Sequence, residues 1–205
     1  SVYQEKPLAV AIPSTVADIQ TLIRFANEHK VTLIPRAAGT SLAGQVVGNG
    51  IVVDISKYFT KILEVNTKEK WVRVQPGVIR DDLNYHLKQY GLMFGPETST
   101  ANRAMIGGML GNNSCGLHSI VWGSVRDHIQ EVTALLSDGS EVVIKAEEFK
   151  PHQFASTTKE KIEHSLYTLL ADETNQQLIK TNFPKASVHR RNTGYALDSL
   201  LAMHP

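Results

Sequence analysis

The first part of the chain alternates short apolar runs with one amphipathic segment. Leu8–Ile12 and Val31–Pro35 are apolar runs of strand length, and Ile51–Asp54 is a third run, rich in β-branched residues. Over residues 15–26 apolar positions recur at helical spacing, behind a threonine that has an aspartate three residues later, as in a capping box. This order predicts a small α/β unit with at least partly parallel strands.

The middle of the chain carries two hairpin patterns, one on each side of a long glycine-rich stretch. Ile62–Asn66 and Trp71–Gln75 are strand-like runs joined by a polar linker, and a helix pattern over residues 79–91 ends at a glycine. Residues 94–123 hold six of the 14 glycines and show little periodicity, which predicts a functional loop. The second hairpin is predicted over residues 131–144, around an Asp-Gly pair.

These patterns predict an α+β protein with two subdomains and a helical extension. Residues 1–56 form the first, α/β subdomain, and residues 57–150 form a second subdomain with a mainly antiparallel sheet and flanking helices. Residues 151–205 contain a helix pattern that again begins with a Thr-x-x-Glu pair. Because the chain stops directly after an apolar stretch, we expect this last segment to lead toward the missing end of a longer domain.

Composition and charge exclude several classes of protein. The chain of 205 residues has 21 Lys and Arg against 20 Asp and Glu, so no excess of positive charge indicates a nucleic-acid partner. No apolar run of about 18 residues occurs and the amino end lacks a signal-peptide core, so we expect a cytoplasmic protein without a membrane span. One cysteine cannot make an internal disulfide or a four-thiolate metal site, and no histidine pair has ligand spacing. We therefore expect no metal site within the chain.

The first glycine-rich loop, residues 36–44, follows a predicted strand and consists largely of small residues. Small side chains let backbone N–H groups approach an anion, Gly39 can adopt a positive φ, and the hydroxyls of Thr40 and Ser41 add donors. The loop therefore suits a pyrophosphate, and an ordinary surface turn is the alternative. Gln45 stands where a P-loop has lysine, and no Rossmann glycine pattern follows the first strand, which disfavours triphosphate and nicotinamide binding.

The second glycine-rich loop, Phe94–Gly123, is more specific. It contains Phe-Gly-Pro-Glu-Thr-Ser-Thr from residue 94, Ile-Gly-Gly-Met-Leu-Gly-Asn-Asn-Ser-Cys-Gly from residue 106, and Trp-Gly-Ser from residue 122. Together with the first loop, this set resembles the FAD-binding domain of the vanillyl-alcohol-oxidase-type flavoproteins, also called the PCMH-type or FAD-linked oxidase fold. The resemblance covers about residues 7–144 and is greatest to the D-lactate, glycolate and D-2-hydroxyglutarate dehydrogenase branch.

The resemblance implies which residues bind FAD. Backbone amides of the first loop hold the pyrophosphate, the Pro-Glu-Thr-Ser segment follows the flavin and its ribityl chain, and a tight Ile-Gly-Gly turn approaches the cofactor. An Asn-containing turn comes next, and Trp-Gly stands where the family usually has Tyr-Gly. The implied FAD-binding residues are Arg36, Ala37, Ala38, Gly39, Thr40, Ser41, Pro96, Glu97, Thr98, Ser99, Ile106, Gly107, Gly108, Asn112, Asn113, Gly116, Trp122 and Gly123.

Two further expectations concern the cofactor linkage and the substrate. Thr40 stands where covalently linked relatives have the histidine that carries the flavin, so the resemblance implies non-covalent FAD. Arg190, Arg191 and Tyr195 resemble a stretch of this branch that precedes a flavin-contacting strand, and an arginine fork suits a substrate carboxylate. A solvated or structural role for these arginines is an equal alternative.

The function implied by the resemblance is that of an FAD-dependent oxidoreductase. It dehydrogenates a small D-2-hydroxy acid by hydride transfer to flavin N5, and the electrons leave to an iron-sulfur segment or a quinone. The chain carries most of the flavin domain and is expected to be inactive alone, since no catalytic base is identified within it. The alternative hypothesis is a non-catalytic FAD- or nucleotide-binding module.

Overall fold

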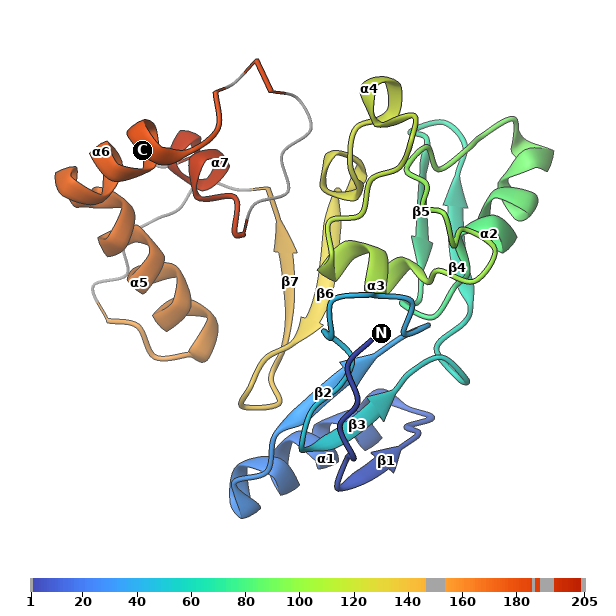
Figure 1. Cartoon of the computed structure of the whole chain (residues 1–205), viewed down its shortest axis with the longest axis horizontal. Helices are drawn as coiled ribbons and strands as arrows, with labels where there is room; N and C mark the ends of the chain where they lie inside the picture. The colour runs from blue at the N-terminus through green and yellow to red at the C-terminus, as the bar shows by residue number, and fades with distance from the viewer. Residues whose placement is uncertain (1, 147–153, 186, 189–193, 204–205) are drawn as a thin grey trace. The chain divides into compact units, whose positions relative to one another are not determined.

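The computed structural model describes residues 2–146, 154–185, 187–188 and 194–203 (Figure 1). The chain forms two compact units, Ser1–His128 and Ile129–Pro205. Among the described residues, no helix has both the length and the apolar content needed to cross a membrane.

The first unit begins with a three-stranded parallel sheet. Strands β1 (Ala9–Ala11), β2 (Leu33–Arg36) and β3 (Ile51–Asp54) lie in the order β1-β3-β2. Helix α1 (Val16–His29) connects β1 to β2, which confirms the predicted strand-helix-strand order. The central strand β3 supplies the core of this sheet, because its first three residues are all buried.

Helix α1 has the capping box that the sequence predicts. The Thr15 hydroxyl accepts a hydrogen bond from the Asp18 backbone N–H, and the Asp18 carboxylate accepts one from the Thr15 N–H. Hydrogen bonds from Ser14 and Thr15 hold the pKa of Asp18 below its ordinary value of 3.8. The helix ends at His29, because the next residue, Lys30, has a left-handed conformation that cannot continue it.

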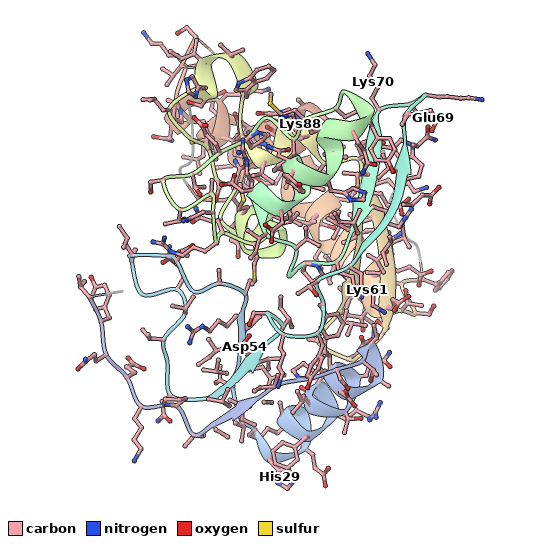
Figure 2. The ribbon with its side chains drawn as sticks, turned by 90° about the vertical axis from the view of Figure 1, so that its right-hand side faces the viewer. His29, Asp54, Lys61, Glu69, Lys70 and Lys88 are labelled. Atoms are coloured by element: carbon pink, nitrogen blue, oxygen red, sulfur yellow. The ribbon has the colours of Figure 1, made fainter. Side chains whose placement is uncertain are left out.

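An antiparallel hairpin and a helix follow in the first unit. Strands β4 (Ile62–Asn66) and β5 (Trp71–Val74) pair as predicted, with Glu69 and Lys70 at the tip of their turn (Figure 2). Helix α2 (Arg80–Leu87) continues into a short 3-10 turn that ends at Gly91, which has a φ of 65°. The two leucines of α2, Leu83 and Leu87, are almost fully buried, so the apolar face of this helix is turned toward the interior of the first unit.

The second glycine-rich loop contains short helices that the sequence did not predict. They are α3 (Ile106–Gly111) and α4 (Ser119–Trp122), followed by the 3-10 turn η2 (Val125–His128). The expectation of a tight turn at residues 106–108 is therefore wrong, because these residues form the first turn of α3. Tertiary hydrogen bonds fix this turn: the Ile106 N–H donates to the Val78 carbonyl at 2.9 Å, and the next N–H donates to the Pro76 carbonyl.

The second unit contains a hairpin and three helices. Strands β6 (Glu131–Leu135) and β7 (Glu141–Lys145) are antiparallel, and the glycine of the predicted Asp-Gly turn has a φ of 83°. Helices α5 (Thr158–Ala171), α6 (Glu173–Asn182) and α7 (Leu197–Ala202) follow. The predicted capping box at the start of α5 is present. The Thr158 hydroxyl donates to the Asp138 carboxylate, and this bond ties the start of α5 to the hairpin turn.

Candidate functional site

The first glycine-rich loop leaves the end of β2 and folds back on itself. Gly39 has a φ of +66°, and a positive φ is what its glycine allows at this position. A Cβ atom at Gly39 would lie 2.8 Å from Nε of Arg36, so the arginine side chain lies over this glycine. Gly44 also has a positive φ, and a Cβ there would lie 2.9 Å from the Tyr3 ring. At Gly39 and Gly44 the loop therefore has little room for a side chain.

Helix α3 lies against this first loop. A Cβ atom built at Gly108 would lie 3.5 Å from Cβ of Ala37, an ordinary van der Waals distance. Figure 1 shows α3 beside the segment that joins β2 to β3. The structure thus brings together the first loop and the Ile-Gly-Gly segment, which are far apart in the sequence and which the resemblance assigned to one cofactor.

Gly107 faces the protein instead. A Cβ atom there would lie 2.5 Å from Cβ of Pro76, and the Gly107 N–H donates to the Pro76 carbonyl at 2.8 Å. The absence of a side chain at this position is explained by close packing against the turn that ends the β4–β5 hairpin. Of the two adjacent glycines, it is Gly108 that faces the first loop.

Helix α2 holds the segment that begins the second loop. The Arg80 guanidinium donates to the carbonyls of Pro96, at 3.1 Å, and of Phe94, at 3.4 Å. The Asn84 amide donates to the Phe94 carbonyl at 3.1 Å and accepts from the Phe94 N–H at 2.8 Å. The Arg80 side chain is only 15% exposed, and Pro96 is among the most buried residues. Sequence reasoning missed both side chains of α2, and its one available signal was their i, i+4 spacing on a helix face.

Glu97 and His118 join the two ends of the second loop. Their side chains lie 2.5 Å apart, and the Glu97 carboxylate also accepts the His118 backbone N–H at 3.2 Å. The side-chain hydrogen bond from His118 is the main reason why the pKa of Glu97 lies below its ordinary value of 4.5. A Cβ at Gly116 would lie 2.5 Å from the Glu97 carbonyl oxygen, so this position also requires glycine.

The two predicted asparagines shape the turn after α3. The Asn112 side-chain amide donates to the Ser114 hydroxyl at 3.1 Å, and the side-chain oxygen Oδ1 of Asn113 accepts the Arg126 backbone N–H at 3.0 Å. Asn113 has a φ of 45°, a conformation that asparagine tolerates better than most residues. Ser114 is buried, with 6% of its surface exposed. These contacts give both asparagines a role in holding the loop.

The remaining predicted residues of the second loop lie near its two ends. A Cβ at Gly95 would lie 3.1 Å from Cβ of Trp122, so the tryptophan packs next to the buried Gly95-Pro96 pair. Gly123 has a φ of 62°, and a Cβ there would lie 2.5 Å from the Asp127 carboxylate. The hydroxyls of Thr98 and the nearby Thr100 are 3.2 Å apart.

The three substrate candidates, Arg190, Arg191 and Tyr195, belong to the part of the sequence that follows the first unit. Arg190 and Arg191 lie outside the described residues. Tyr195 belongs to the second unit, where 87% of its surface is exposed. Within the described ranges, no group of three or more His, Cys, Asp or Glu side chains is placed to hold a metal ion.

The two facing segments have the chemistry that an anionic dinucleotide requires. Residues 37–50 and 104–116 contain no charged side chain, so no carboxylate in them would repel a phosphate. Small side chains at Ala37 and Gly108 leave the backbone accessible where the segments meet. The residues present therefore fit a bound dinucleotide cofactor.

Comparison with known proteins identifies the family. The FAD binding domain model matches residues 7–145. The D-2-hydroxyglutarate dehydrogenase of Haemophilus influenzae is 45% identical over 142 residues, which cover 68% of this chain and 14% of that protein. The enzyme of the same name from Escherichia coli is 38% identical over 203 residues, 96% of this chain and 20% of its own length. The chain thus spans a fifth or less of these relatives.

Solved structures show the same fold. Carbohydrate oxidase from Microdochium nivale aligns with a TM-score of 0.61 and 25% identity, covering 68% of this chain and 30% of that chain. For 6-hydroxy-D-nicotine oxidase from Arthrobacter nicotinovorans the TM-score is 0.63 at 21% identity, with 70% of this chain and 31% of that chain covered. These likenesses confirm the predicted α+β fold of the PCMH-type flavoproteins. The chain belongs to the FAD-binding-domain family.

Proposed function

We propose that this chain binds FAD and is the flavin-binding part of a dehydrogenase that oxidises a small D-2-hydroxy acid. The observation that carries the proposal is the contact between the two glycine-rich segments, in which Gly108 of α3 faces Ala37 of the first loop. The relatives named D-2-hydroxyglutarate dehydrogenase, at 38% to 45% identity, support the substrate class. Bound FAD would supply the two-electron redox chemistry.

The chain's own residues would bind and orient the cofactor. In this proposal the N–H groups of residues 36–41 face the pyrophosphate, and the segment from Pro96 to Ser99 runs along the flavin. The bonds from Arg80 and Asn84 keep that segment at a fixed place relative to α2. The Glu97–His118 contact keeps the two ends of the second loop together. Orientation of this kind is the protein's main contribution in a flavoenzyme.

We further propose that FAD is held without a covalent bond. Thr40 has no nucleophilic nitrogen with which to form the histidyl link found in some relatives. Acid precipitation of the holoprotein should therefore release the yellow colour into the supernatant. Flavin that stays in the protein pellet would contradict this part of the proposal.

The experiment that tests the function has two stages. The first measures FAD binding to the full chain by the quenching of flavin fluorescence, with riboflavin as the comparison ligand. The second measures the reduction of an artificial electron acceptor by the longer protein with D-2-hydroxyglutarate, D-lactate or glycolate as substrate. FAD binding with turnover of one of these acids supports the dehydrogenase. Tight FAD binding without turnover of any supports a non-catalytic module, and no FAD binding refutes both.

The electron acceptor of the longer protein is part of the same proposal. We expect an iron-sulfur segment or a quinone to take the electrons, because dehydrogenation of a hydroxy acid would release two electrons that must leave the site before the next turnover. Electron paramagnetic resonance of the substrate-reduced protein would show a cluster signal in the first case. A rate that depends on added quinone, without such a signal, indicates the second.

A further inference from the structure

Arg36 is the one charged residue in residues 36–50 and 104–116, the two segments that face each other. Residues 37–50 and 104–116 carry no charged side chain, and Arg36 is the residue that opens the first of them. A dinucleotide diphosphate carries two negative charges, and backbone N–H groups offer only partial positive charges to them. Within these two segments, only the Arg36 side chain can therefore offer a full positive charge to the diphosphate of the proposed FAD site.

The backbone of Arg36 is fixed by the sheet. It is the last residue of β2, and its carbonyl accepts the Ile55 N–H at 3.0 Å. Its side chain folds back over the loop. A Cβ atom built on Gly39 would lie 2.8 Å from Nε, 2.9 Å from Nη2 and 3.1 Å from Cζ of Arg36. The guanidinium therefore lies against the glycine with positive φ at the bend of the loop.

The guanidinium has no partner among the described residues, although a carboxylate lies one strand away. Asp54 is the register partner of Arg36 at the end of β3 (Figure 2). Its carboxylate accepts the Ser56 backbone N–H at 2.9 Å and makes no ion pair with Arg36 within the part of the chain that the structure describes. The hydrogen-bond donors of the Arg36 side chain are therefore available to a ligand.

We propose that the side chain of Arg36, and not its backbone alone, is a ligand of the cofactor diphosphate through its guanidinium. This inference deepens the proposed function and rests on it. A guanidinium offers two parallel N–H donors that match two phosphate oxygens, and a bond of this kind is stronger than one from a neutral amide. Loss of such a charge-assisted contact should weaken binding by roughly tenfold to a hundredfold.

The test compares Arg36→Gln and Arg36→Lys with a matched control, Arg24→Gln. Arg24 lies on α1 in the same unit, exposed, and donates to the Thr21 hydroxyl. Dissociation constants for FAD and for ADP alone are measured on the full chain by fluorescence and calorimetry at several salt concentrations. Arg36→Gln should weaken both ligands by about tenfold or more and reduce the salt dependence of binding, because one ion contact is lost. Arg36→Lys should fall between that variant and the wild type, since it keeps the charge without the fork.

The results distinguish a failure of the Arg36 inference from a failure of the proposed function. Equal affinities for ADP in Arg36→Gln and Arg24→Gln, with FAD bound by the wild type, would overturn the inference and leave the proposed function standing. A wild-type chain that binds neither FAD nor ADP overturns both. Circular dichroism and urea midpoints serve as folding controls: if both Arg36 variants fail to fold, the side chain is structural and the inference is wrong.

Discussion

The two adjacent glycines at the start of α3 give the sharpest test of the described packing. Alanine at position 107 would place its Cβ 2.5 Å from Cβ of Pro76 and 3.1 Å from the Pro76 carbonyl oxygen. Alanine at position 108 would place its Cβ 3.5 Å from Cβ of Ala37, with no closer neighbour. The substitutions are chemically identical and lie one residue apart on the same helix, so each is the control for the other.

The expected effects have opposite signs. Replacing glycine by alanine inside a helix stabilises it by up to about 1 kcal/mol, and this gain applies to both positions. At Gly107 the clash with Cβ of Pro76, which would be 2.5 Å away, adds an overpacking cost of roughly 1 to 3 kcal/mol. If the helix shifts to relieve the clash, the Gly107–Pro76 hydrogen bond is strained, at about 1 kcal/mol. Gly107→Ala should therefore destabilise the unit by about 1 to 3 kcal/mol, while Gly108→Ala is neutral or stabilising.

Urea denaturation followed by tryptophan fluorescence measures this difference. Trp71 and Trp122 both lie in the first unit, so their emission reports on the unit that contains α3. A loss of 2 kcal/mol lowers the ratio of folded to unfolded protein by roughly thirtyfold. Equal midpoints for the two variants, or a larger loss for Gly108→Ala, would refute the packing of α3 against Pro76.

Three further predictions concern caps, pH and the loop closure. Thr15→Ala should lower the free energy of unfolding by about 1 kcal/mol because it removes the N-cap of α1. Thr21→Ala removes an exposed hydroxyl that donates to the Ala17 carbonyl and accepts from Arg24 but caps no helix end, so it should change the urea midpoint little. Hydrogen bonds from Ser140 and Thr158 lower the pKa of Asp138 from 3.8 to about 2, so the stability they contribute is present above pH 3.8 and is lost as the pH falls toward 2. The urea midpoint of the wild type should therefore decrease between pH 3.8 and pH 2. The Asp138→Asn variant should have a lower midpoint at neutral pH and a smaller decrease over the same range. An equal decrease of the midpoint with pH in both proteins would argue against the contact. His118→Ala should weaken FAD binding, because it removes the side chain that joins Glu97 to the far end of the second loop; unchanged affinity would separate this contact from the cofactor site.

Local patterns predicted the elements whose stability is local. The capping boxes before α1 and α5 combine a threonine with a carboxylate three residues on, and each bond joins groups within one turn. The hairpin of β6 and β7 was predicted from its Asp-Gly turn, whose glycine has the required positive φ. In each of these cases the residues that make the interaction are neighbours in the sequence.

The helix α3 could not be predicted in this way. Glycine disfavours helix, and three of the six residues of α3 are glycine. The turn forms because Ile106 and Gly107 donate to carbonyls of a segment some thirty residues earlier, and no sequence pattern encodes that pairing. Tertiary hydrogen bonds override propensity here.

The side chains that hold the second loop in place also depend on contacts between residues that are far apart in the sequence. The predicted binding residues follow from a family resemblance, but Arg80 and Asn84, which hold the segment from Phe94 to Pro96, lie on a helix that showed only ordinary amphipathic spacing. Likewise, no spacing or motif in the sequence indicates that Glu97 contacts His118. Such partners are visible only when the chain is folded.

The position of β3 in the centre of the first sheet has a consequence for the order of folding. β3 pairs with β1 on one side and β2 on the other, so neither outer strand has a partner until β3 has been synthesised. Both hairpins, in contrast, close over a short turn, and short-range contacts form much faster than long-range parallel pairing. We therefore expect pulsed hydrogen exchange during refolding to protect the amides of β4 and β5 before those of β1. In a growing chain, the loop that follows Arg36 would then reach its final shape only after the strand beyond it has been inserted.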